Sequence, residues 1–233
     1  MEKPVIMITG AGGNLGSAVV RELAGRGARL ACVERNPGTL AAVLASLPSD
    51  ADVLGLDGID LTDMTSCLSA VQKSHDRFGH VDGLVNTVGG FRIAPVDRSG
   101  IDQWDALMTM NARSAYAISA AVLPGMQERQ HGRIVHIAAS PGLKAGGRQS
   151  AYAASKAAVI RLTEAIAAEN RVHRITANCI LPGTIDTPQN REAMPDANTE
   201  TWVPAGAIAR LIAFLVSQEA SAVTGAAITA AGF

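Results

Sequence analysis

Short apolar runs alternate with longer amphipathic stretches along most of the chain. The short runs are rich in Val, Ile, Leu and Ala, which is typical of strands buried on both faces of a sheet. We expect strands at residues 5–8, 29–33, 53–56, 83–86, 134–138, 175–180 and 226–229. A helix lies between most of these runs, so the pattern predicts parallel strands joined by right-handed crossovers.

This alternation predicts an α/β fold: a doubly wound parallel sheet with helices on both faces, formed by residues 1–233 as a single domain. The 233 residues are 48% apolar, which is enough to bury such a core, and no repeat or linker divides them. Ligands of such sheets gather at the carboxyl ends of the strands. The only long irregular stretch runs through residues 182–204, and we expect residues 184–204 to form a lid.

Composition narrows the class of partner. The formal net charge is −1 and the chain has no block of Lys or Arg, which argues against nucleic acid and favours a small-molecule substrate. The chain has no signal-like segment and no run of about 18 apolar residues, so we expect a cytoplasmic protein that does not enter membranes.

The cysteines and histidines indicate no metal site. Cys32, Cys67 and Cys179 are widely spaced within apolar segments, which is typical of buried, reduced thiols. The histidines show no zinc-ligand spacing, and we expect each to be exposed or hydrogen-bonded in the core. They are His75, His80, His131, His136 and His173.

A glycine-rich turn follows the first strand and opens a helix, in the sequence Thr9-Gly10-Ala11-Gly12-Gly13-Asn14-Leu15-Gly16. Glycines there permit a tight turn and close approach of the backbone to the pyrophosphate of a dinucleotide. Glu34 ends the second strand, where a carboxylate accepts hydrogen bonds from the adenosine ribose and repels a 2′-phosphate. Arg35 would attract that phosphate if it turned inward. We therefore favour NAD(H), with NADP(H) as the alternative.

Two further segments follow strand ends. Asp60, after the third strand, is expected either to contact the adenine edge or to cap the next helix, and the sequence leaves both open. Residues 86–90 end the fourth strand in a turn where the backbone can approach the cofactor.

Tyr152 and Lys156 are four residues apart on a predicted helix, so their side chains share one face. A tyrosine is a poor acid–base group at neutral pH, but an adjacent ammonium and a positive nicotinamide would lower its pKa. Lys156 can also hold the ribose. The pair predicts proton transfer next to a bound nicotinamide.

With these motifs the chain resembles the short-chain dehydrogenase/reductase family over nearly its whole length. The resemblance rests on the glycine-rich turn, Asn86-Thr87-Val88-Gly89, Asn111, Tyr152-Ala153-Ala154-Ser155-Lys156 and Pro182-Gly183. It implies a seven-stranded Rossmann fold, NAD(P)(H), a homodimer or homotetramer, and catalysis by Asn, Ser, Tyr and Lys. Alanine-rich helical stretches at residues 101–126 and 151–169 suit close packing between subunits.

The resemblance also assigns roles to individual residues. Tyr152 becomes the proton donor or acceptor, Lys156 the neighbour that lowers its pKa, and Asn111 the residue that holds a proton-conducting water. Thr187 is expected to meet the nicotinamide carboxamide. The expected cofactor-binding set is Gly10, Gly12, Gly13, Asn14, Leu15, Gly16, Glu34, Arg35, Asp60, Leu61, Asn86, Val88, Gly89, Tyr152, Lys156, Pro182, Gly183, Thr184 and Thr187.

The chain departs from the family pattern at two positions. Asn14 replaces the second glycine of the turn; it tolerates a positive φ, and Gly13 offers a turn shifted by one residue. Ala139 stands thirteen residues before Tyr152, where the family has its serine, and Ser140 follows it. Both departures, and the segment from Asp186 to Pro204, resemble dihydropteridine reductases, a divergent branch. A conjugated C=N acceptor is polarised by protonating nitrogen, so it has less need of a second hydroxyl donor.

The sequence leaves three functions open: a pteridine-type or imine reductase, an ordinary carbonyl reductase or alcohol dehydrogenase that uses Ser140, and a non-catalytic NAD-binding regulator. It also leaves two accounts of residues 186–202 open. They either cap the sheet, with Trp202 buried and Arg191 paired with Asp196, or close over the substrate and place Trp202 or Met194 against a flat acceptor.

Overall fold

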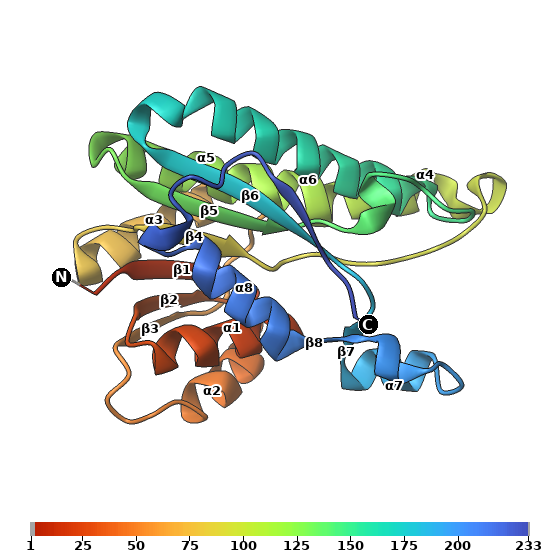
Figure 1. Ribbon diagram of the computed structural model, residues 1–233, viewed down its shortest axis with the longest axis horizontal. Coiled ribbons are helices and arrows are strands. Elements are labelled where there is room, and N and C mark those ends of the chain that lie inside the picture. The colour runs from red at the N-terminus through yellow and green to blue at the C-terminus, as the bar shows by residue number, and fades with distance from the viewer. Residues whose placement is uncertain (1–2, 233) are drawn as a thin grey trace.

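A seven-stranded sheet, entirely parallel, runs through the centre of the molecule in the order β3-β2-β1-β4-β5-β6-β9 (Figure 1). The computed structural model describes residues 3–232. The strands are β1 (Val5–Thr9), β2 (Arg29–Val33), β3 (Val53–Leu56), β4 (Gly83–Asn86), β5 (Gly132–Ile137), β6 (Ile175–Pro182) and β9 (Ala227–Ala230). All seven predicted strands are present, with ends that differ by two residues at most, and the predicted fold class is confirmed.

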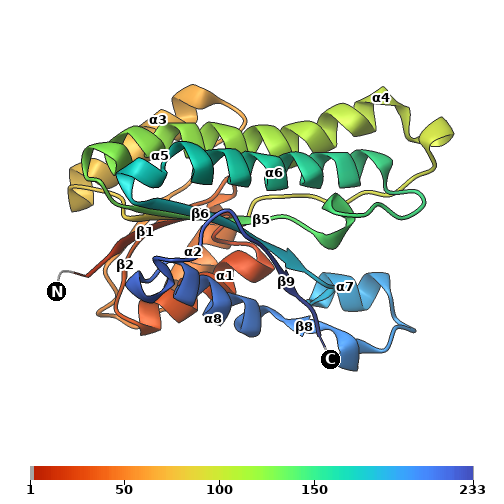
Figure 2. The same cartoon turned by 45° about the horizontal axis from the view of Figure 1, so that its top comes forward.

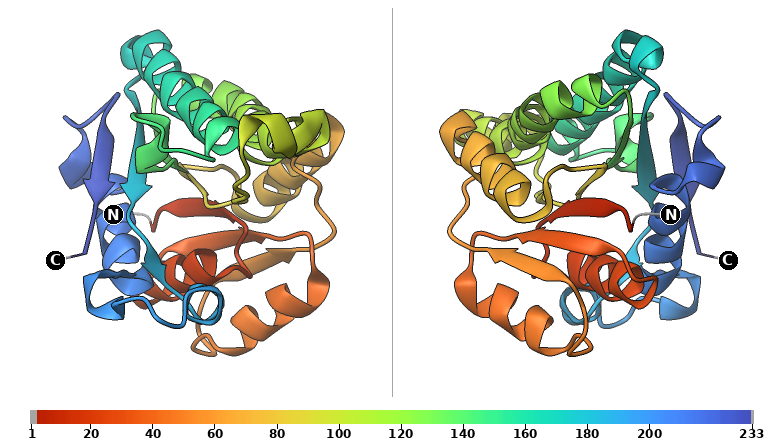
Figure 3. Two further views of the ribbon diagram at one scale, coloured as in Figure 1. Left: turned by 90° about the vertical axis from the view of Figure 1, so that its right-hand side faces the viewer. Right: turned by 90° about the vertical axis from the view of Figure 1, so that its left-hand side faces the viewer.

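Helices cover both faces of this sheet, as the turned views show (Figures 2 and 3). One layer holds α1 (Asn14–Gly25), α2 (Pro37–Ala45) and α8 (Ala205–Leu215), and the other holds α3 (Met64–Phe78), α5 (Ser114–Glu128) and α6 (Ser150–Glu169). Side chains of β1 pack against both helical layers. Ile6 and Ile8 lie in the hydrophobic core beneath α1, α2 and α8, while Val5 and Met7 lie in the core beneath α3, α5 and α6. Because both faces are buried, the strand is apolar throughout.

Asp63, not Asp60, caps helix α3, so one of the two roles expected for Asp60 is wrong. The Asp63 carboxylate accepts hydrogen bonds from the backbone N–H groups of Thr65 and Ser66. Asp60 instead accepts from the N–H and the hydroxyl of Thr62, which closes a local turn after β3. Asp60 therefore lies one turn ahead of the helix that it was expected to cap.

The helical stretch expected at residues 101–126 is divided in three. Helix α4 (Val96–Leu107) is kinked at Gly100, which has a φ of 68°. A π-helical segment (Met108–Arg113) connects it to α5. Such wide turns shift the register of the side chains that follow, and here the shifted segment carries Asn111.

Residues 182–204 contain secondary structure of their own, so the expectation of an irregular stretch is wrong. Strands β7 (Ile185–Asp186) and β8 (Val203–Pro204) pair with each other, and helix α7 (Pro188–Ala193) and a 3₁₀ turn (Thr199–Thr201) lie between them. The Thr187 hydroxyl caps α7. This segment lies beyond the carboxyl ends of the sheet strands, across from α4 (Figure 1).

The sheet order changes direction between β1 and β4, and the two strands are neighbours. In parallel sheets this is the point where the loops that follow the strands separate and leave a crevice. The glycine-rich turn follows β1 and residues 86–90 follow β4. The fold thus brings the predicted motifs to one edge. Within residues 3–232, no helix is both long and apolar enough to cross a membrane.

Candidate active site

The glycine-rich turn runs tightly against β4 and its own helix. Gly10 has a φ of 68°, and a side chain there would lie 2.9 Å from the Thr87 hydroxyl. A Cβ on Gly16 would lie 1.9 Å from the carbonyl oxygen of Gly10, so helix α1 approaches the turn more closely than any other residue permits. Gly13 has a φ of −72° and Asn14 begins the helix, so neither adopts a positive φ.

The amino terminus of α1 fits the pyrophosphate of a dinucleotide. Helices α2 and α3 are capped by the side chains of Asn36 and Asp63, whereas α1 begins after Gly13 with no side-chain cap. Gly13 and Asn14 are exposed at this end. The first-turn N–H groups of an uncapped helix carry partial positive charge and bind anions.

Glu34 lies beside this turn, as the sequence predicts. One carboxylate oxygen accepts a 2.9 Å hydrogen bond from the N–H of Gly12. The other accepts from the N–H groups of Arg35 and Asn36, at 2.8 and 3.3 Å. The negative charge is thus fixed next to the cofactor turn, while the Arg35 side chain is exposed.

Asp60 lies at the same edge and stays ionised. Its pKa is lowered mainly by the two hydrogen bonds from Thr62, with smaller contributions from the positive charges of Arg35 and Arg113. Leu61, beside it, is buried. The expected contact of Asp60 with adenine stays a prediction.

The end of β4 is tied to the end of β1 by side chains. The Thr9 hydroxyl donates to Asn86 Oδ1 at 2.6 Å, and this oxygen also accepts from the N–H of Val88. The Thr87 hydroxyl donates to the carbonyl of Thr9 at 2.8 Å. These bonds hold the turn at residues 86–90 against the glycine-rich turn.

Asn111 fixes the continuation of that turn. Its Oδ1 accepts from the N–H of Gly90 at 2.8 Å, and its Nδ2 donates to the Gly90 carbonyl at 3.0 Å. The same Nδ2 lies 2.9 Å from the Ser155 hydroxyl, which donates to the carbonyl of Tyr152. Asn111, which is 1% exposed, therefore connects the β4 turn to the helix that carries the tyrosine.

Lys156 is buried behind Gly89. Its Nζ donates to the Ile137 carbonyl at the end of β5, at 2.9 Å. A Cβ on Gly89 would lie 2.9 Å from Nζ and 2.8 Å from Asn111 Oδ1, so this glycine lets the backbone pass directly over both groups. Burial lowers the pKa of Lys156 to about 8.

Tyr152 differs from the expectation in its acidity. Burial raises its pKa to about 12, whereas the neighbouring ammonium was expected to lower it. Loss of solvation is the cause in the protein alone; the expected lowering also involves a bound nicotinamide, so it stays a prediction for the complex. Tyr152 is thus a protonated phenol at neutral pH, suited to donating a proton.

Phe91, which the sequence analysis missed, packs edge-on against Tyr152. The ring centroids are 4.8 Å apart with the planes at 87°, and Phe91 is 59% exposed. An exposed aromatic residue beside a reactive group is a candidate wall for a substrate. The signal in the sequence was a phenylalanine directly after Gly89-Gly90, in a chain with only 3% aromatic residues.

Ala139 and Ser140 lie where β5 ends, close to the amino-terminal half of α6. Ala139 is buried, while Ser140 is exposed and begins a 3₁₀ turn (Ser140–Gly142). Gly142 packs against the backbone of Lys156 and Ala157 in α6. Within residues 3–232 the Ser140 hydroxyl makes no hydrogen bond, so it is free to meet a ligand.

A side-chain hydrogen bond joins the segment of residues 184–204 to the glycine-rich turn. Asn14 Nδ2 donates to Gln189 Oε1, in α7, at 2.5 Å. A cavity of about 510 Å³ lies between α1 and the start of the lid, lined in part by Asn14 and Thr187. Pro182 ends β6, and Gly183 and Thr184 follow it as exposed residues at the base of the lid.

The ion pair expected for Arg191 is wrong, and the burial expected for Trp202 is confirmed. Arg191 forms a bidentate ion pair with Asp186, not Asp196, at 2.6 and 2.8 Å. Asp186 lies five residues before Arg191, and the intervening turn of α7 brings the two side chains together. Trp202 is buried, as in the capping account, while Met194 is 40% exposed.

His136 and the three cysteines are ionisable groups that lie in the core. His136 is buried between Ser119 and Asn86, and burial lowers its pKa to about 4. This confirms the expectation of a hydrogen-bonded core histidine. All three cysteines are buried free thiols, also as expected.

Comparison with known proteins decides the family. The family model described as "short chain dehydrogenase" matches residues 4–198. The chain belongs to this family. The match confirms the family expected from the Tyr152 and Lys156 motif, and with it an oxidoreductase of the Rossmann fold that uses a nicotinamide dinucleotide.

Relatives of this short-chain dehydrogenase extend over its full length. The 3-oxoacyl-[acyl-carrier-protein] reductase FabG of Escherichia coli is 33% identical over 236 residues, 96% of this chain and 94% of the relative. The 2-(S)-hydroxypropyl-CoM dehydrogenase 3 of Xanthobacter autotrophicus is 28% identical over 246 residues, 100% of this chain and 96% of the relative.

Among solved structures, levodione reductase matches with a TM-score of 0.92 and 30% identity, covering 98% of this chain and 96% of that one. An NAD⁺-bound xylitol dehydrogenase matches with a TM-score of 0.90 and 26% identity, covering 99% and 98%. Both likenesses extend over the whole sheet and its helices.

Proposed function

We propose that this chain is an NAD(P)(H)-dependent reductase in which Tyr152 donates a proton to the substrate, supported by Lys156 and Asn111. The observation that carries the proposal is the bonded set at the carboxyl edge, where Asn111 holds Gly90 while Gly89 passes over Lys156. This set lies next to the uncapped start of α1. Proton donation and dinucleotide binding thus share one crevice.

Each group in this set has a defined task. A bound nicotinamide supplies or accepts the hydride. The Tyr152 hydroxyl, protonated at neutral pH, donates its proton to the substrate atom that gains negative charge. Lys156, charged below about pH 8 and held by Ile137, stabilises the phenolate that remains. Asn111 keeps the β4 turn in place, and we retain its expected role in holding a proton-conducting water.

NAD(H) is the favoured cofactor. Glu34 places a carboxylate against the N–H of Gly12, where an added 2′-phosphate would meet negative charge. Arg35 is exposed and bound to Glu34 only through its backbone. The xylitol dehydrogenase that resembles this chain is NAD⁺-bound.

Ala139 stands where the family has a serine, so Tyr152 is the one remaining hydroxyl donor of the family pattern. This favours a substrate that a single proton donor can activate. Ala139 offers no hydroxyl, and the exposed Phe91 beside Tyr152 suits a flat ring. We therefore propose a conjugated C=N substrate of the pteridine type. The second candidate is a carbonyl, supported by the free hydroxyl of Ser140 and by the names of the relatives, which refer to oxoacyl and hydroxypropyl substrates.

We also propose that residues 184–204 form a closing lid and that the protein is a homodimer or homotetramer. Residues 184–204 lie beyond the carboxyl ends of the strands (Figure 1), and Gln189 accepts a hydrogen bond from Asn14 in the cofactor turn, which supports a closing lid. A homodimer or homotetramer is supported by large apolar side chains exposed along α4 and α5, among them Ile101, Trp104 and Tyr116.

The test begins with titration of the purified protein by NADH and by NADPH. Consumption of the bound dinucleotide is then followed with a dihydropterin and with a panel of ketones and aldehydes, using wild type and Ser140→Ala. Turnover of the pterin that survives Ser140→Ala supports the C=N reductase. Turnover of carbonyls that falls about 10²-fold in Ser140→Ala supports the carbonyl reductase, because that is the effect of losing an oxyanion donor. Tight binding of dinucleotide without turnover of any substrate would leave the regulator.

A further inference from the structure

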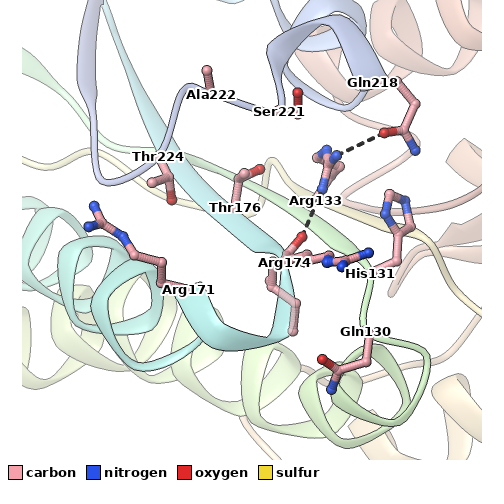
Figure 4. Close-up of a pocket in the computed structure, with 11 residues that line it drawn as sticks. Gln130, His131, Arg133, Arg171, Arg174, Thr176, Gln218, Ser221, Ala222 and Thr224 are labelled. Carbon is pink, nitrogen blue, oxygen red and sulfur yellow. Dashed lines mark hydrogen bonds between the residues drawn. The ribbon is translucent and has the colours of Figure 1, made fainter.

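A second cavity, of about 700 Å³, lies at the edge of the sheet where β5 and β6 begin (Figure 4). Its lining includes residues at the starts of β5 and β6 and residues of the loop that precedes β9, so it surrounds the amino ends of these strands. Lys156 and Ser140 lie near the carboxyl ends of the same sheet. The cavity is therefore separate from the crevice described above.

The lining of this cavity is positively charged. Arg133, Arg171 and Arg174 contribute to it, and its eleven lining residues include neither Asp nor Glu. Within residues 3–232 none of the three arginines forms an ion pair. His131, also in the lining, has a lowered pKa, caused first by burial and next by the charge of Arg133.

Arg133 is an unusual member of this set because it is only 3% exposed. Its guanidinium donates to neutral acceptors alone: the carbonyls of Gly132, Arg174 and Ser217 and the side-chain oxygen of Gln218. Two of these bonds are visible in Figure 4. Buried charges are ordinarily paired, so an unbalanced guanidinium leaves a positive potential in the cavity.

Thr176 supplies an independent observation. It lies in β6, lines the cavity and is 5% exposed, and its hydroxyl oxygen has no hydrogen-bond partner within residues 3–232. A buried hydroxyl without a partner is unfavourable unless a ligand or water engages it. Arg174, nearby, has a φ of 56°, a conformation that costs an ordinary residue energy and that directs its carbonyl to Arg133.

We propose that this cavity binds a phosphate group, either free or carried by a small organic molecule, with Arg171, Arg174 and Thr176 as its contacts. Guanidinium groups match the oxygens of phosphate with parallel hydrogen bonds, and a dianion balances several of them better than one carboxylate does. A volume of about 700 Å³ exceeds what a bare ion needs and leaves space for an organic part.

The experiment measures binding by calorimetry to protein saturated with dinucleotide, so that the pyrophosphate site is filled. The probes are inorganic phosphate, glycerol 3-phosphate, malonate and glycerol at constant ionic strength. The variants are the double substitution Arg171→Gln/Arg174→Gln and the isosteric Thr176→Val. Arg98→Gln, an exposed arginine in α4 at the other end of the molecule, is the matched control.

We expect phosphate or its ester to bind with one site per chain, malonate to bind more weakly, and glycerol to show no binding. The double variant raises the Kd at least tenfold and Thr176→Val raises it several-fold, while Arg98→Gln binds like wild type. Tighter binding of glycerol 3-phosphate than of inorganic phosphate identifies an esterified ligand, and the reverse identifies the free ion. Absence of binding, or equal loss in Arg98→Gln, overturns the proposal. Neither result depends on whether the chain reduces a pterin or a carbonyl.

Discussion

The ammonium group of Lys156 is buried, and burial brings its pKa into the pH range of ordinary assays. The Nζ atom donates a hydrogen bond to the Ile137 carbonyl, and burial lowers the pKa of the ammonium to about 8. Tyr152, with a pKa of about 12, stays protonated over the whole neutral range. Of the two residues, Lys156 is therefore the one that titrates under ordinary assay conditions.

This difference predicts the pH profile of reduction. As the pH rises through about 8, Lys156 loses its proton and no longer stabilises the phenolate, so kcat/KM for the reducible substrate falls. The profile is measured at saturating dinucleotide for wild type and for Lys156→Arg. Arginine remains charged, so this variant should lose the fall near pH 8 even if its rate is lower. A wild-type profile that is flat between pH 7 and 9 would contradict the assignment.

The positions of these side chains follow from the sequence better than their chemical properties do. The positions of Tyr152, Lys156 and Glu34 are predictable, because spacing along a helix and order along a strand decide which edge they reach. Asn111 was expected from the family resemblance alone, because it lies in the π-helical segment. The acidity of Tyr152 is not predictable, because it depends on burial and on where the ammonium points. The partner of Arg191 was missed for a similar reason, since helix α7 was not foreseen.

At the scale of elements, the lid is connected to the cofactor turn by the pair of Asn14 and Gln189. Asn14 stands where the family has a glycine, so this contact depends on one of the chain's two departures from the family pattern. The pair joins the first turn of α1 to α7, which are distant in sequence. The lid proposed above would therefore sense the cofactor site through this hydrogen bond.

A double-mutant cycle tests this connection. Asn14→Gly and Gln189→Ala each remove the hydrogen bond, and we expect each to raise KM for the reduced substrate roughly threefold to tenfold, as loss of about 1 kcal/mol does. The double variant should be no worse than either single variant. Met194→Ala, also in the lid, is the control and should combine additively with Asn14→Gly. Additive effects of Asn14→Gly and Gln189→Ala would exclude a shared contact.

Strands were easier to predict than helices for a physical reason. A parallel strand buried on both faces must be apolar throughout. The ends of the seven strands were therefore predicted to within two residues of the observed ends. Helix periodicity does not report a π turn or a kink, so the break at Gly100 and the segment Met108–Arg113 were missed. Asp60 and Asp63 both precede α3, and only the backbone shows which one caps it.

At the scale of the whole molecule, His136 couples folding to pH. It is fully buried between Ser119 and Asn86, with a pKa of about 4 instead of its ordinary 6.5. The unfolded chain therefore binds a proton between these two values that the folded chain does not. Stability contributed by the neutral histidine is complete above about pH 6.5 and is lost as the pH falls toward 4.

The expected loss is measurable. A lowering of the pKa from 6.5 to about 4 corresponds to roughly 3 kcal/mol of unfolding free energy across that interval. Urea unfolding of wild type at several pH values should show this decline, and His136→Asn should show a shallower one, whatever its own stability. Parallel pH dependences for the two proteins would mean that His136 is not the group responsible.

Reduction through Tyr152 in the crevice at the carboxyl edge is tested most directly by the Tyr152→Phe variant. This variant removes the hydroxyl alone and keeps the ring that packs against Phe91. With the substrate found in the panel, we predict that kcat falls at least about 10²-fold, the usual effect of losing a general acid. The Kd for NADH should stay within about twofold of wild type. Turnover at the wild-type rate by Tyr152→Phe would contradict the account.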